Sequence, residues 1–464
     1  MPASDLAFWS ATDLVHAFAQ RTVSPVEATD AALAQIRRLN GQLNAFCLVD
    51  EEGARSSART SEARWAKGAP LGSVDGVPTS IKDLSLTRGW PTMRGSKTVD
   101  PAGPWQEDAP FVARMREQGA VLLGKTTTPE FGWKGVTDSP VTGVTRNPWN
   151  PQKTPGGSSG GAAVACATGM GALHQGSDGG GSVRIPAAFT GVYGIKPTFG
   201  RVPAYPSSPF GTVAHIGPLT RTVSDAALML SVMGRPDPRD WYATADATDF
   251  RRACLTSVRG WRVAFCPSFG VGTVDPEVEA LVAAAAATFA EFGATVETIN
   301  PPFADCEPIF RAHWFAGAAN LLAGIPAEKQ EHIDPGLRAV AAEGAKIQLL
   351  DYLAAVKARE TLGARMNAFH QTWDLLLTPT LPIPAFDAGV EVPSASGMDR
   401  WTEWTPFSYP FNLTQQPAAS IPCGRTAAGL PVGLQIVAAK GRDDKVLAAS
   451  AAFEALQQIE LPQI

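Results

Sequence analysis

One glycine-rich stretch, residues 154–197, constrains the fold more than any other part of this 464-residue chain. It contains two serines bracketed by glycines: Ser158 in the run GGSSGG, and Ser182 after three consecutive glycines. Small apolar residues, 162–169, separate the two turns. Glycine permits positive φ angles and close approach of the backbone to a ligand. Two hydroxyls presented this way, with a short buried helix between them, indicate nucleophilic chemistry, which needs a base because a free hydroxyl is a poor nucleophile.

A lysine earlier in the chain completes a pattern with these serines. Lys82 lies in the run GVPTSIKD, which precedes both glycine-rich turns. In residue type, order and spacing the three segments resemble the signature of the amidase signature family of serine hydrolases, over about residues 10–235 and again over 373–450. The resemblance implies a Ser–cis-Ser–Lys triad, in which Ser182 attacks the acyl carbon and Ser158 relays its proton to a neutral Lys82.

The surroundings of Lys82 fit the role of a base. A lysine taken at random lies in solvent, but this one follows Val77 and Ile81 and precedes Leu84. Together with the resemblance, this setting predicts a buried lysine on a short strand over residues 79–83. Burial disfavours the charged form and lowers the pKa of a lysine, which lets it act as a neutral base.

The turn before Ser182 predicts a site for a developing negative charge. A serine at the start of a helix is often only an N-cap, but three glycines exceed what a cap requires. Backbone N–H groups in such a turn can point together at one oxyanion. By resemblance, the donors are the N–H groups of Gly179, Gly180, Gly181 and Ser182.

Three neighbouring residues are expected to support this site. Ser159 and Asp178 are predicted to hydrogen-bond within it, and Arg184 to brace the loop. Gly180 departs from the family, which usually has a bulkier residue there, so we expect a looser turn or open space above the nucleophile. The resemblance implies no metal and no organic cofactor.

Residues 119–126 match the phosphate-binding pattern GxxxxGK[ST], but the context excludes a P-loop. A P-loop has a strand before its first glycine, and the residues after that glycine form the phosphate cradle. Here a predicted helix, about 109–117, precedes the glycine, and residues 120–123 are predicted to be the strand itself.

Residues 156–160 also match the nucleophile elbow GxSxG of the Ser-His-Asp α/β-hydrolases. Such an elbow needs a strand immediately before the serine, and the prolines at 148, 151 and 155 disfavour one. Five histidines could complete such a triad, but none has a recognisable context: His174, His215, His313, His332 and His370.

The composition is that of a globular protein with a large core, since 45% of the residues are hydrophobic and 18% are charged. The formal net charge of −5 argues against nucleic acid as the main partner. The six cysteines include no CxxC pair, which argues against a disulfide framework and a thiolate zinc site. We expect buried free thiols.

The N-terminal residues show no basic segment followed by an apolar one, so no signal peptide is expected. No apolar run approaches the ~20 residues that span a bilayer. We therefore expect a cytoplasmic protein, a monomer or homodimer, that acts on a small-molecule amide or carbamate and has neither a nucleic-acid nor a membrane partner.

Strand and helix patterns alternate along the chain, which predicts an α/β fold. The resemblance makes this a single domain over residues 1–464: one large α/β/α sandwich with a central mixed sheet covered by helices. It has a signature core (about 70–235), a variable substrate-side segment (about 236–372) and a sheet-completing C-terminal part (373–464). Expected sheet segments are 45–49, 79–83, 120–123, 172–176, 262–265, 295–299, 373–380, 406–413, 418–423 and 430–437. Expected helices are two within 4–40, then 51–67, 109–117, 183–189, 226–233, 276–292, 308–322, 348–372 and 443–456.

Twelve tryptophans are many for this length. By resemblance, several aromatic residues lie in loops around the substrate pocket: Phe131, Trp133, Trp149, Tyr205, Phe210, Trp401, Trp404, Phe407, Tyr409 and Phe411. They favour an apolar pocket for aryl or alkyl amides and anilides, and the same acyl-transfer geometry admits esters and carbamates (urethanes).

Three alternatives remain open. The glutaminase subunit of a tRNA-dependent amidotransferase shares this signature, although residues 212–216 look more like those of stand-alone amidases. A Ser-His-Asp esterase of α/β-hydrolase type and a non-catalytic binding protein on the same scaffold are the others. A hydrolysis panel that includes glutamine separates the enzymes.

Overall fold

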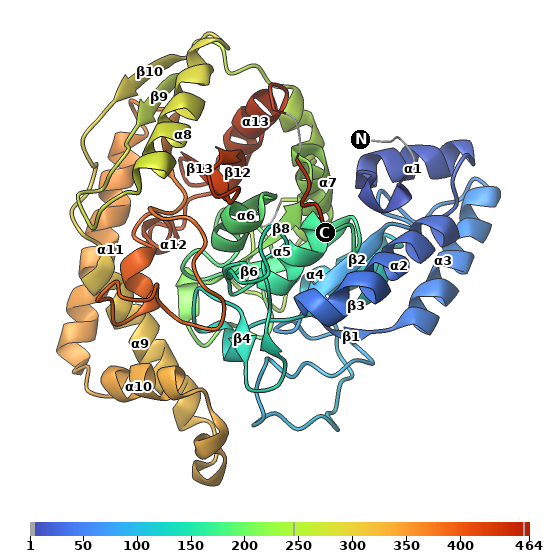
Figure 1. Ribbon diagram of the computed structural model, residues 1–464, viewed down its shortest axis with the longest axis horizontal. Helices are drawn as coiled ribbons and strands as arrows, with labels where there is room; N and C mark the ends of the chain where they lie inside the picture. The colour runs from blue at the N-terminus through green and yellow to red at the C-terminus, as the bar shows by residue number, and fades with distance from the viewer. Residues whose placement is uncertain (1–4, 245, 458–459) are drawn as a thin grey trace.

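A mixed sheet of eleven strands forms the centre of the molecule, and helices pack around it (Figure 1). The computed structural model describes residues 5–244, 246–457 and 460–464. In sheet order the strands are β1 (Phe46–Val49), β3 (Val121–Thr126), β2 (Pro78–Lys82), β6 (Leu173–Asp178), β8 (His215–Thr220), β7 (Tyr193–Lys196), β12 (Ala418–Arg425), β13 (Pro431–Ala438), β11 (Leu375–Pro379), β9 (Arg262–Phe265) and β10 (Thr295–Thr298). The predicted α/β fold with a mixed sheet is confirmed.

Strand direction determines where the ends of the strands meet. β2 runs parallel to both of its neighbours, β3 and β6, whereas β8 runs antiparallel to β6 and to β7. Because parallel neighbours end at the same edge of a sheet, Lys82 at the end of β2 and Asp178 at the end of β6 lie at one edge.

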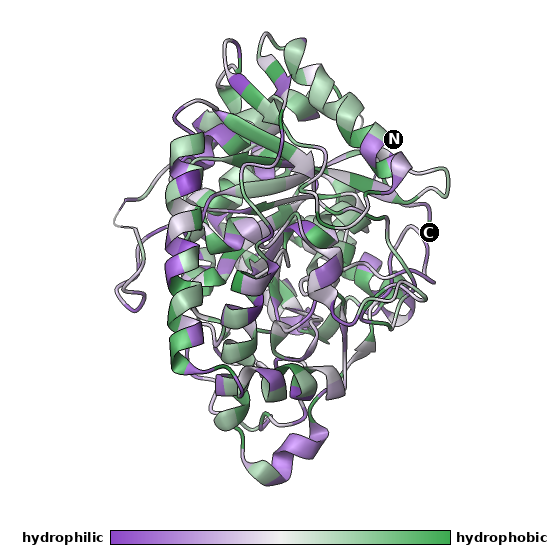
Figure 2. Ribbon diagram, turned by 90° about the vertical axis from the view of Figure 1, so that its left-hand side faces the viewer, coloured by the Kyte–Doolittle hydropathy of each residue, from purple (hydrophilic) through white to green (hydrophobic). Residues whose placement is uncertain are grey.

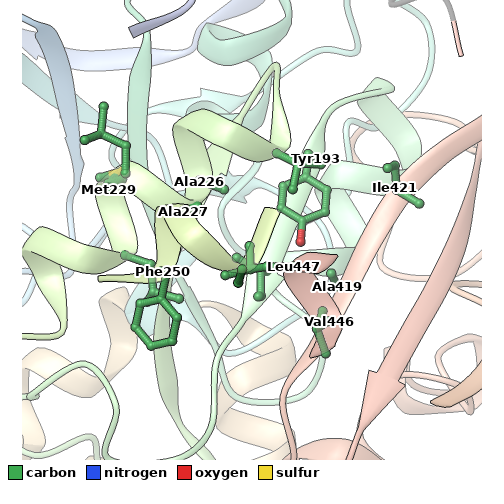
Figure 3. Close-up of a cluster of buried hydrophobic side chains, with 14 of the residues drawn as sticks. Tyr193, Ala226, Ala227, Met229, Phe250, Ala419, Ile421, Val446 and Leu447 are labelled. Carbon is green, nitrogen blue, oxygen red and sulfur yellow. The ribbon is translucent and has the colours of Figure 1, made fainter. Parts of the chain in front are cut away.

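Side chains alternate across each strand, so successive residues of one strand pack in different hydrophobic clusters. The two largest clusters are called the first and the second core. In β13, Leu434 and Ile436 pack in one core and Val437 in the other. β11 divides its leucines in the same way, with Leu377 on the first side and Leu376 on the second. Figure 3 shows part of the first core, where strand residues and helix residues meet.

Thirteen α-helices surround the sheet in the described part of the chain. They are α1 (Ala11–Gln20), α2 (Pro25–Leu43), α3 (Glu51–Ala66), α4 (Pro110–Glu117), α5 (Gly160–Ala167), α6 (Arg184–Thr190), α7 (Val223–Met233), α8 (Pro276–Ala287), α9 (Glu307–Ala323), α10 (Pro335–Gly344), α11 (Leu349–Phe369), α12 (Pro410–Leu413) and α13 (Asp443–Glu454). Figure 1 shows α1–α3 at one end of the molecule and α9–α11 at the other. The outer helices carry interspersed hydrophilic residues (Figure 2). Among the described residues, no helix combines the length and apolar character that a membrane crossing requires.

Local sequence signals explain several of these boundaries. α2 begins with a capping box: the Ser24 hydroxyl accepts the Glu27 N–H at 3.1 Å, and the Glu27 carboxylate accepts the Ser24 N–H at 2.8 Å. Pro25 occupies the first turn, where its missing N–H has no cost. The two N-terminal helices are therefore confirmed.

The predicted elements are found with one exception. Residues 406–413, expected in the sheet, instead contain the short helix α12, because Pro410 cannot donate to a strand ladder and fits the first turn of a helix. Strands β7 and β8, helix α10 and the separate two-stranded sheet of β4 (Asp138–Ser139) and β5 (Gly143–Val144) were not predicted. All six cysteines are free, as expected, but only Cys166, Cys266 and Cys306 are buried; Cys254 and Cys423 are half-buried and Cys47 is exposed.

Candidate active site

Lys82 lies in the interior at the end of β2, and all five residues of that strand are buried. Its backbone N–H donates to the Gln175 side chain of β6 at 3.0 Å. Burial lowers the pKa of Lys82 well below its ordinary value, and the nearby Asp178 carboxylate only partly opposes this effect. The structure therefore places an amine with a depressed pKa where the sequence predicts a neutral base.

Three serine hydroxyls surround the Lys82 amine. Its Nζ lies 2.7 Å from the Ser158 Oγ, 2.9 Å from the Ser159 Oγ and 3.0 Å from the Ser177 Oγ. The Ser159 hydroxyl also donates to the Ser177 carbonyl at 3.1 Å. Ser177 was not predicted, because nothing in the sequence marks it apart from its position one residue before Asp178.

Ser158 lies in the irregular turn before α5. The Gly157–Ser158 peptide bond is cis, as the resemblance implies. No strand lies immediately before this serine in the described chain, since the nearest preceding strand, β5 (Gly143–Val144), ends well upstream. The nucleophile elbow of an α/β-hydrolase is therefore absent from this part of the structure.

Ser182 is held beside the two serines of the first turn. The Ser182 carbonyl accepts the Ser159 N–H at 3.1 Å, and Ser182 is only 3% exposed. Within the described residues, the Ser182 hydroxyl makes no hydrogen bond, so the Ser158–Ser182 link of the expected relay is not formed in this structure. Such catalytic contacts are often loose without substrate and tighten when it binds.

The buried pair Asp178–Arg184 braces the turn between them. The Asp178 carboxylate accepts the Arg184 Nη2 at 2.9 Å and the Val183 N–H at 3.1 Å. Burial alone would raise the pKa of Asp178, but Arg184 holds it well below its usual value. Arg184 further donates to the Ser408 carbonyl and the Asn412 side chain. The Asp178–Arg184 pair therefore ties both ends of the turn to each other and to the segment 408–412.

The backbone N–H groups of this turn have different environments. The Gly181 N–H donates to the Asp178 Oδ1 at 2.8 Å, so it is engaged and does not face an oxyanion. This corrects the expected set of four donors. Within the described chain the N–H groups of Gly179, Gly180 and Ser182 have no acceptor, and the Gly180 carbonyl accepts the Ser408 hydroxyl at 2.5 Å. Three donors are therefore available.

Aromatic rings, rather than open space, cover the glycine turn. A Cβ built at Gly180 would lie 2.7 Å from both Phe310 and Trp401, and one at Gly179 would lie 2.7 Å from Trp314. The expectation that Gly180 loosens the turn or opens space is wrong. The glycines instead let the rings pack directly on the backbone.

A cleft of about 620 Å³ opens beside Ser158 and Gly179. This volume lies within the ~300–1,000 Å³ range of small-molecule sites. Phe210 and Trp314 stack on its wall with ring centroids 3.7 Å apart. Trp314 comes from α9, within the variable segment, and was not predicted.

The aromatic residues expected at the pocket divide into three groups. Phe131, Tyr205 and Phe210 line the cleft. Trp149 lines a separate cavity of about 80 Å³. The others belong to the second hydrophobic core: Trp133, Trp401, Trp404, Phe407, Tyr409 and Phe411.

The P-loop-like run 119–126 and His174, a candidate for a Ser-His-Asp triad, have structural roles instead. The Lys125 of GKT lies within β3 and donates to the Thr92 hydroxyl at 2.9 Å, so residues 119–126 do not form a phosphate cradle. His174 pairs with the Ser80 hydroxyl at 2.8 Å, and burial lowers the pKa of His174 to about 3. Among the described residues, no group of three or more His, Cys, Asp or Glu side chains could hold a metal ion.

Comparison with known proteins identifies the family to which this chain belongs. The family model for amidases matches residues 27–447. The chain therefore belongs to the amidase family, the amidase signature enzymes, which are hydrolases of carbon–nitrogen bonds. An acylamidase of Rhodococcus erythropolis is 37% identical over 98% of this chain and 97% of the relative.

Other relatives are similar over comparable lengths. A glutamyl-tRNA(Gln) amidotransferase subunit of Myxococcus xanthus (strain DK1622) is 35% identical over 95% of this chain and 96% of that protein. The crystal structure of a bacterial aryl acylamidase of the amidase signature family superposes with a TM-score of 0.89 at 33% identity, covering 97% of this chain and 96% of that one.

Proposed function

We propose that the protein is an amidohydrolase that cleaves aryl or alkyl amides, including anilides, through an acyl-enzyme on Ser182. Esters and carbamates enter the same site, because their acyl carbons are attacked in the same way. One observation carries the proposal: a buried amine, Lys82, contacts the Ser158 hydroxyl at 2.7 Å beside a turn with unpaired backbone N–H groups.

The contacts of Lys82 can satisfy an ammonium, and once a proton is lost they fit a neutral amine that accepts from Ser158. A neutral amine has two N–H donors and one lone pair. The Ser159 hydroxyl already donates its proton to the Ser177 carbonyl, so it receives an N–H from Lys82. With the second N–H directed to Ser177, the lone pair faces the Ser158 hydroxyl, the nearest of the three.

The reaction follows from this arrangement. Ser158 passes its proton to Lys82 and takes the proton of Ser182 as the Ser182 Oγ bonds to the acyl carbon. The N–H groups of Gly179, Gly180 and Ser182 stabilise the oxyanion. The relay returns the proton to the amine nitrogen, the C–N bond breaks, and the amine leaves. Water then adds to the acyl-enzyme through the same relay, releasing the acid and restoring Ser182.

The cleft and the relatives together support the substrate class. Stacked aromatic rings such as Phe210 and Trp314 provide an apolar surface for an aryl or alkyl group. Both an acylamidase and an aryl acylamidase are similar to the chain over nearly its whole length. The continuous sheet, which contains strands from the core, the variable segment and the C-terminal part, supports the interpretation of one domain.

A hydrolysis panel on the purified chain tests the proposal. It contains an anilide, an alkyl amide, an ester, a carbamate and glutamine. We expect turnover of the anilide and alkyl amide, with loss in Ser182→Ala. The second candidate, the glutaminase component of an amidotransferase, is favoured by the relatives of that kind. Turnover of glutamine alone, dependent on a second protein of such a complex, would establish it and overturn the proposal.

A further inference from the structure

The cleft beside Ser158 is lined by an arginine that pairs with no other side chain among the described residues. Two residues with charged side chains, Arg94 and Asp240, line it. The Asp240 carboxylate accepts the Ala204 N–H at 2.8 Å and the Tyr242 N–H at 2.9 Å. Over the described residues, the Arg94 guanidinium makes neither a hydrogen bond nor an ion pair. The half-buried guanidinium carries five N–H donors, and the described residues use none of them.

The backbone holds Arg94 in this position. Its φ angle of 55° lies in the left-handed region, which residues other than glycine seldom occupy. On either side, the Met93 and Gly95 N–H groups donate to the Asp83 carboxylate at 3.1 and 3.4 Å. The Arg94 carbonyl accepts the Phe131 N–H at 2.7 Å. The uncommon conformation is therefore fixed by the residue that follows Lys82 and by a residue that lines the cleft.

Nearby acidic groups do not neutralise Arg94. Asp83 is the nearest candidate, but its carboxylate is used by two backbone N–H groups and lies 3.9 Å from the buried Lys125 amine. Burial lowers the pKa of Arg94, and Asp83 only partly offsets this. An incoming anion would supply the missing charge.

Arg94 and Ser158 line the same cleft, and a chain of contacts links the Arg94 backbone to Ser158. Phe131, which donates to the Arg94 carbonyl, is followed by Gly132, and a Cβ at Gly132 would lie 3.3 Å from the Ser158 Oγ. One molecule in the cleft can thus extend from Ser158 to Arg94. A carboxylate suits the planar, five-donor guanidinium, which it can bind through two parallel hydrogen bonds.

We propose that Arg94 is a substrate-recognition residue that binds a carboxylate on the amide substrate, so that the enzyme prefers anionic amides to neutral analogues of the same shape. This rests on the proposed amidohydrolase function. It defines a substrate class: acyl amides with a carboxylate on the acyl or the amine half.

Two pairs of substrates of matched shape test the proposal. Succinanilate and butyranilide differ by a carboxylate or a methyl group on the acyl half, and hippurate and N-ethylbenzamide differ in the same way on the amine half. The measured quantity is the ratio of kcat/KM for the anionic and neutral members. Arg94→Met should lower this ratio by about 10- to 100-fold for at least one pair, the value of a charge-assisted hydrogen bond, and Arg94→Lys should restore part of it.

Lys97→Met is the matched control, because it removes the same charge from an exposed position in the same loop. It should leave both ratios unchanged. The pair that responds identifies which half of the substrate faces Arg94. Identical ratios in Arg94→Met and the wild type for both pairs, in proteins with equal Tm, would overturn the proposal.

A binding measurement separates this inference from the proposed chemistry. Calorimetry of succinanilate and hippurate is carried out on Ser182→Ala, and again on Ser182→Ala with Arg94→Met. The second substitution should raise Kd by about 10- to 100-fold for the anion that the ratio test selects. If wild-type enzyme hydrolyses no amide while this difference persists, the proposed function fails and the carboxylate site remains. Equal Kd values for both anions would refute the site even if amides are hydrolysed.

Discussion

Substituting Gly180 by alanine tests how the aromatic rings and the catalytic turn depend on each other. The new Cβ would lie 2.7 Å from Phe310 and from Trp401, whereas carbon contacts are favourable at about 3.5–4.0 Å. The rings cannot move aside freely, since Phe310 is fully buried and lies against Trp314 with ring centroids 5.4 Å apart. The turn must therefore move by roughly 1 Å.

Two effects of this movement are measurable. A displacement of roughly 1 Å at a reacting centre costs about 100-fold in rate, so kcat for an anilide should fall by about that factor, equivalent to about 2.7 kcal/mol. Overpacking should also lower the free energy of unfolding by about 1–3 kcal/mol. Chemical denaturation and steady-state kinetics on the same preparation measure both quantities.

Gly363→Ala provides the matched control. Gly363 lies within α11, and a Cβ there meets nothing within 4 Å. Alanine should raise the helix stability by about 0.8–1.0 kcal/mol and leave kcat unchanged. If Gly180→Ala lowers stability but leaves kcat unchanged, the Gly180 N–H is not an oxyanion donor. If it changes neither, the described packing of the rings on the turn is wrong.

Three further predictions concern the serines, the lysine and the brace. Ser182→Ala should eliminate the acyl-enzyme that mass spectrometry detects in the wild type; an adduct that persists would place the nucleophile elsewhere. Because the pKa of Lys82 is lowered in the folded state, the unfolded chain binds one more proton between that pKa and 10.5, so folding gains stability as pH rises. The unfolding free energy of the wild type minus that of Lys82→Met should therefore rise by about 1.4 kcal/mol per pH unit in this window, and a flat difference would show a charged lysine. Asp178→Asn leaves Arg184 buried without its carboxylate and should cost about 3–5 kcal/mol, whereas Asp444→Asn, which alters an exposed pair, should cost at most about 1 kcal/mol; equal costs would contradict the bracing role.

Much of the fold could be predicted because its signals are local. Ser24 and Glu27 mark the start of α2 in the sequence itself, and the apolar run around Ile81 predicts the strand that carries Lys82. β7 and β8 were missed because a glycine and a proline, Gly194 and Pro218, interrupt their patterns. Their positions are fixed by neighbouring strands, which no short window contains.

The candidate site likewise combines residues that local motifs predict with residues that only the folded chain brings together. The positions of Lys82 and Ser158 follow from their motifs, and the structure brings their side chains together. The third hydroxyl on the lysine, from Ser177, depends on which face of β6 a side chain occupies. The engagement of the Gly181 N–H by Asp178 depends on how the turn folds back on a strand end. Trp314 reaches the cleft from a helix that is far away in the sequence, so only the packing of the whole chain reveals it.

The side chains that cover the glycine turn, residues 179–181, come from segments other than those that carry the predicted catalytic residues. Because these glycines contribute no side chains, Phe310, Trp314 and Trp401 shape the space over the turn, and they come from α9 and from residues 401–404. The residues of the proposed proton relay, Lys82, Ser158 and Ser182, lie in other parts of the chain. A combinatorial library confined to α9 and residues 401–404 can therefore vary the side chains packed over the turn without replacing Lys82, Ser158 or Ser182.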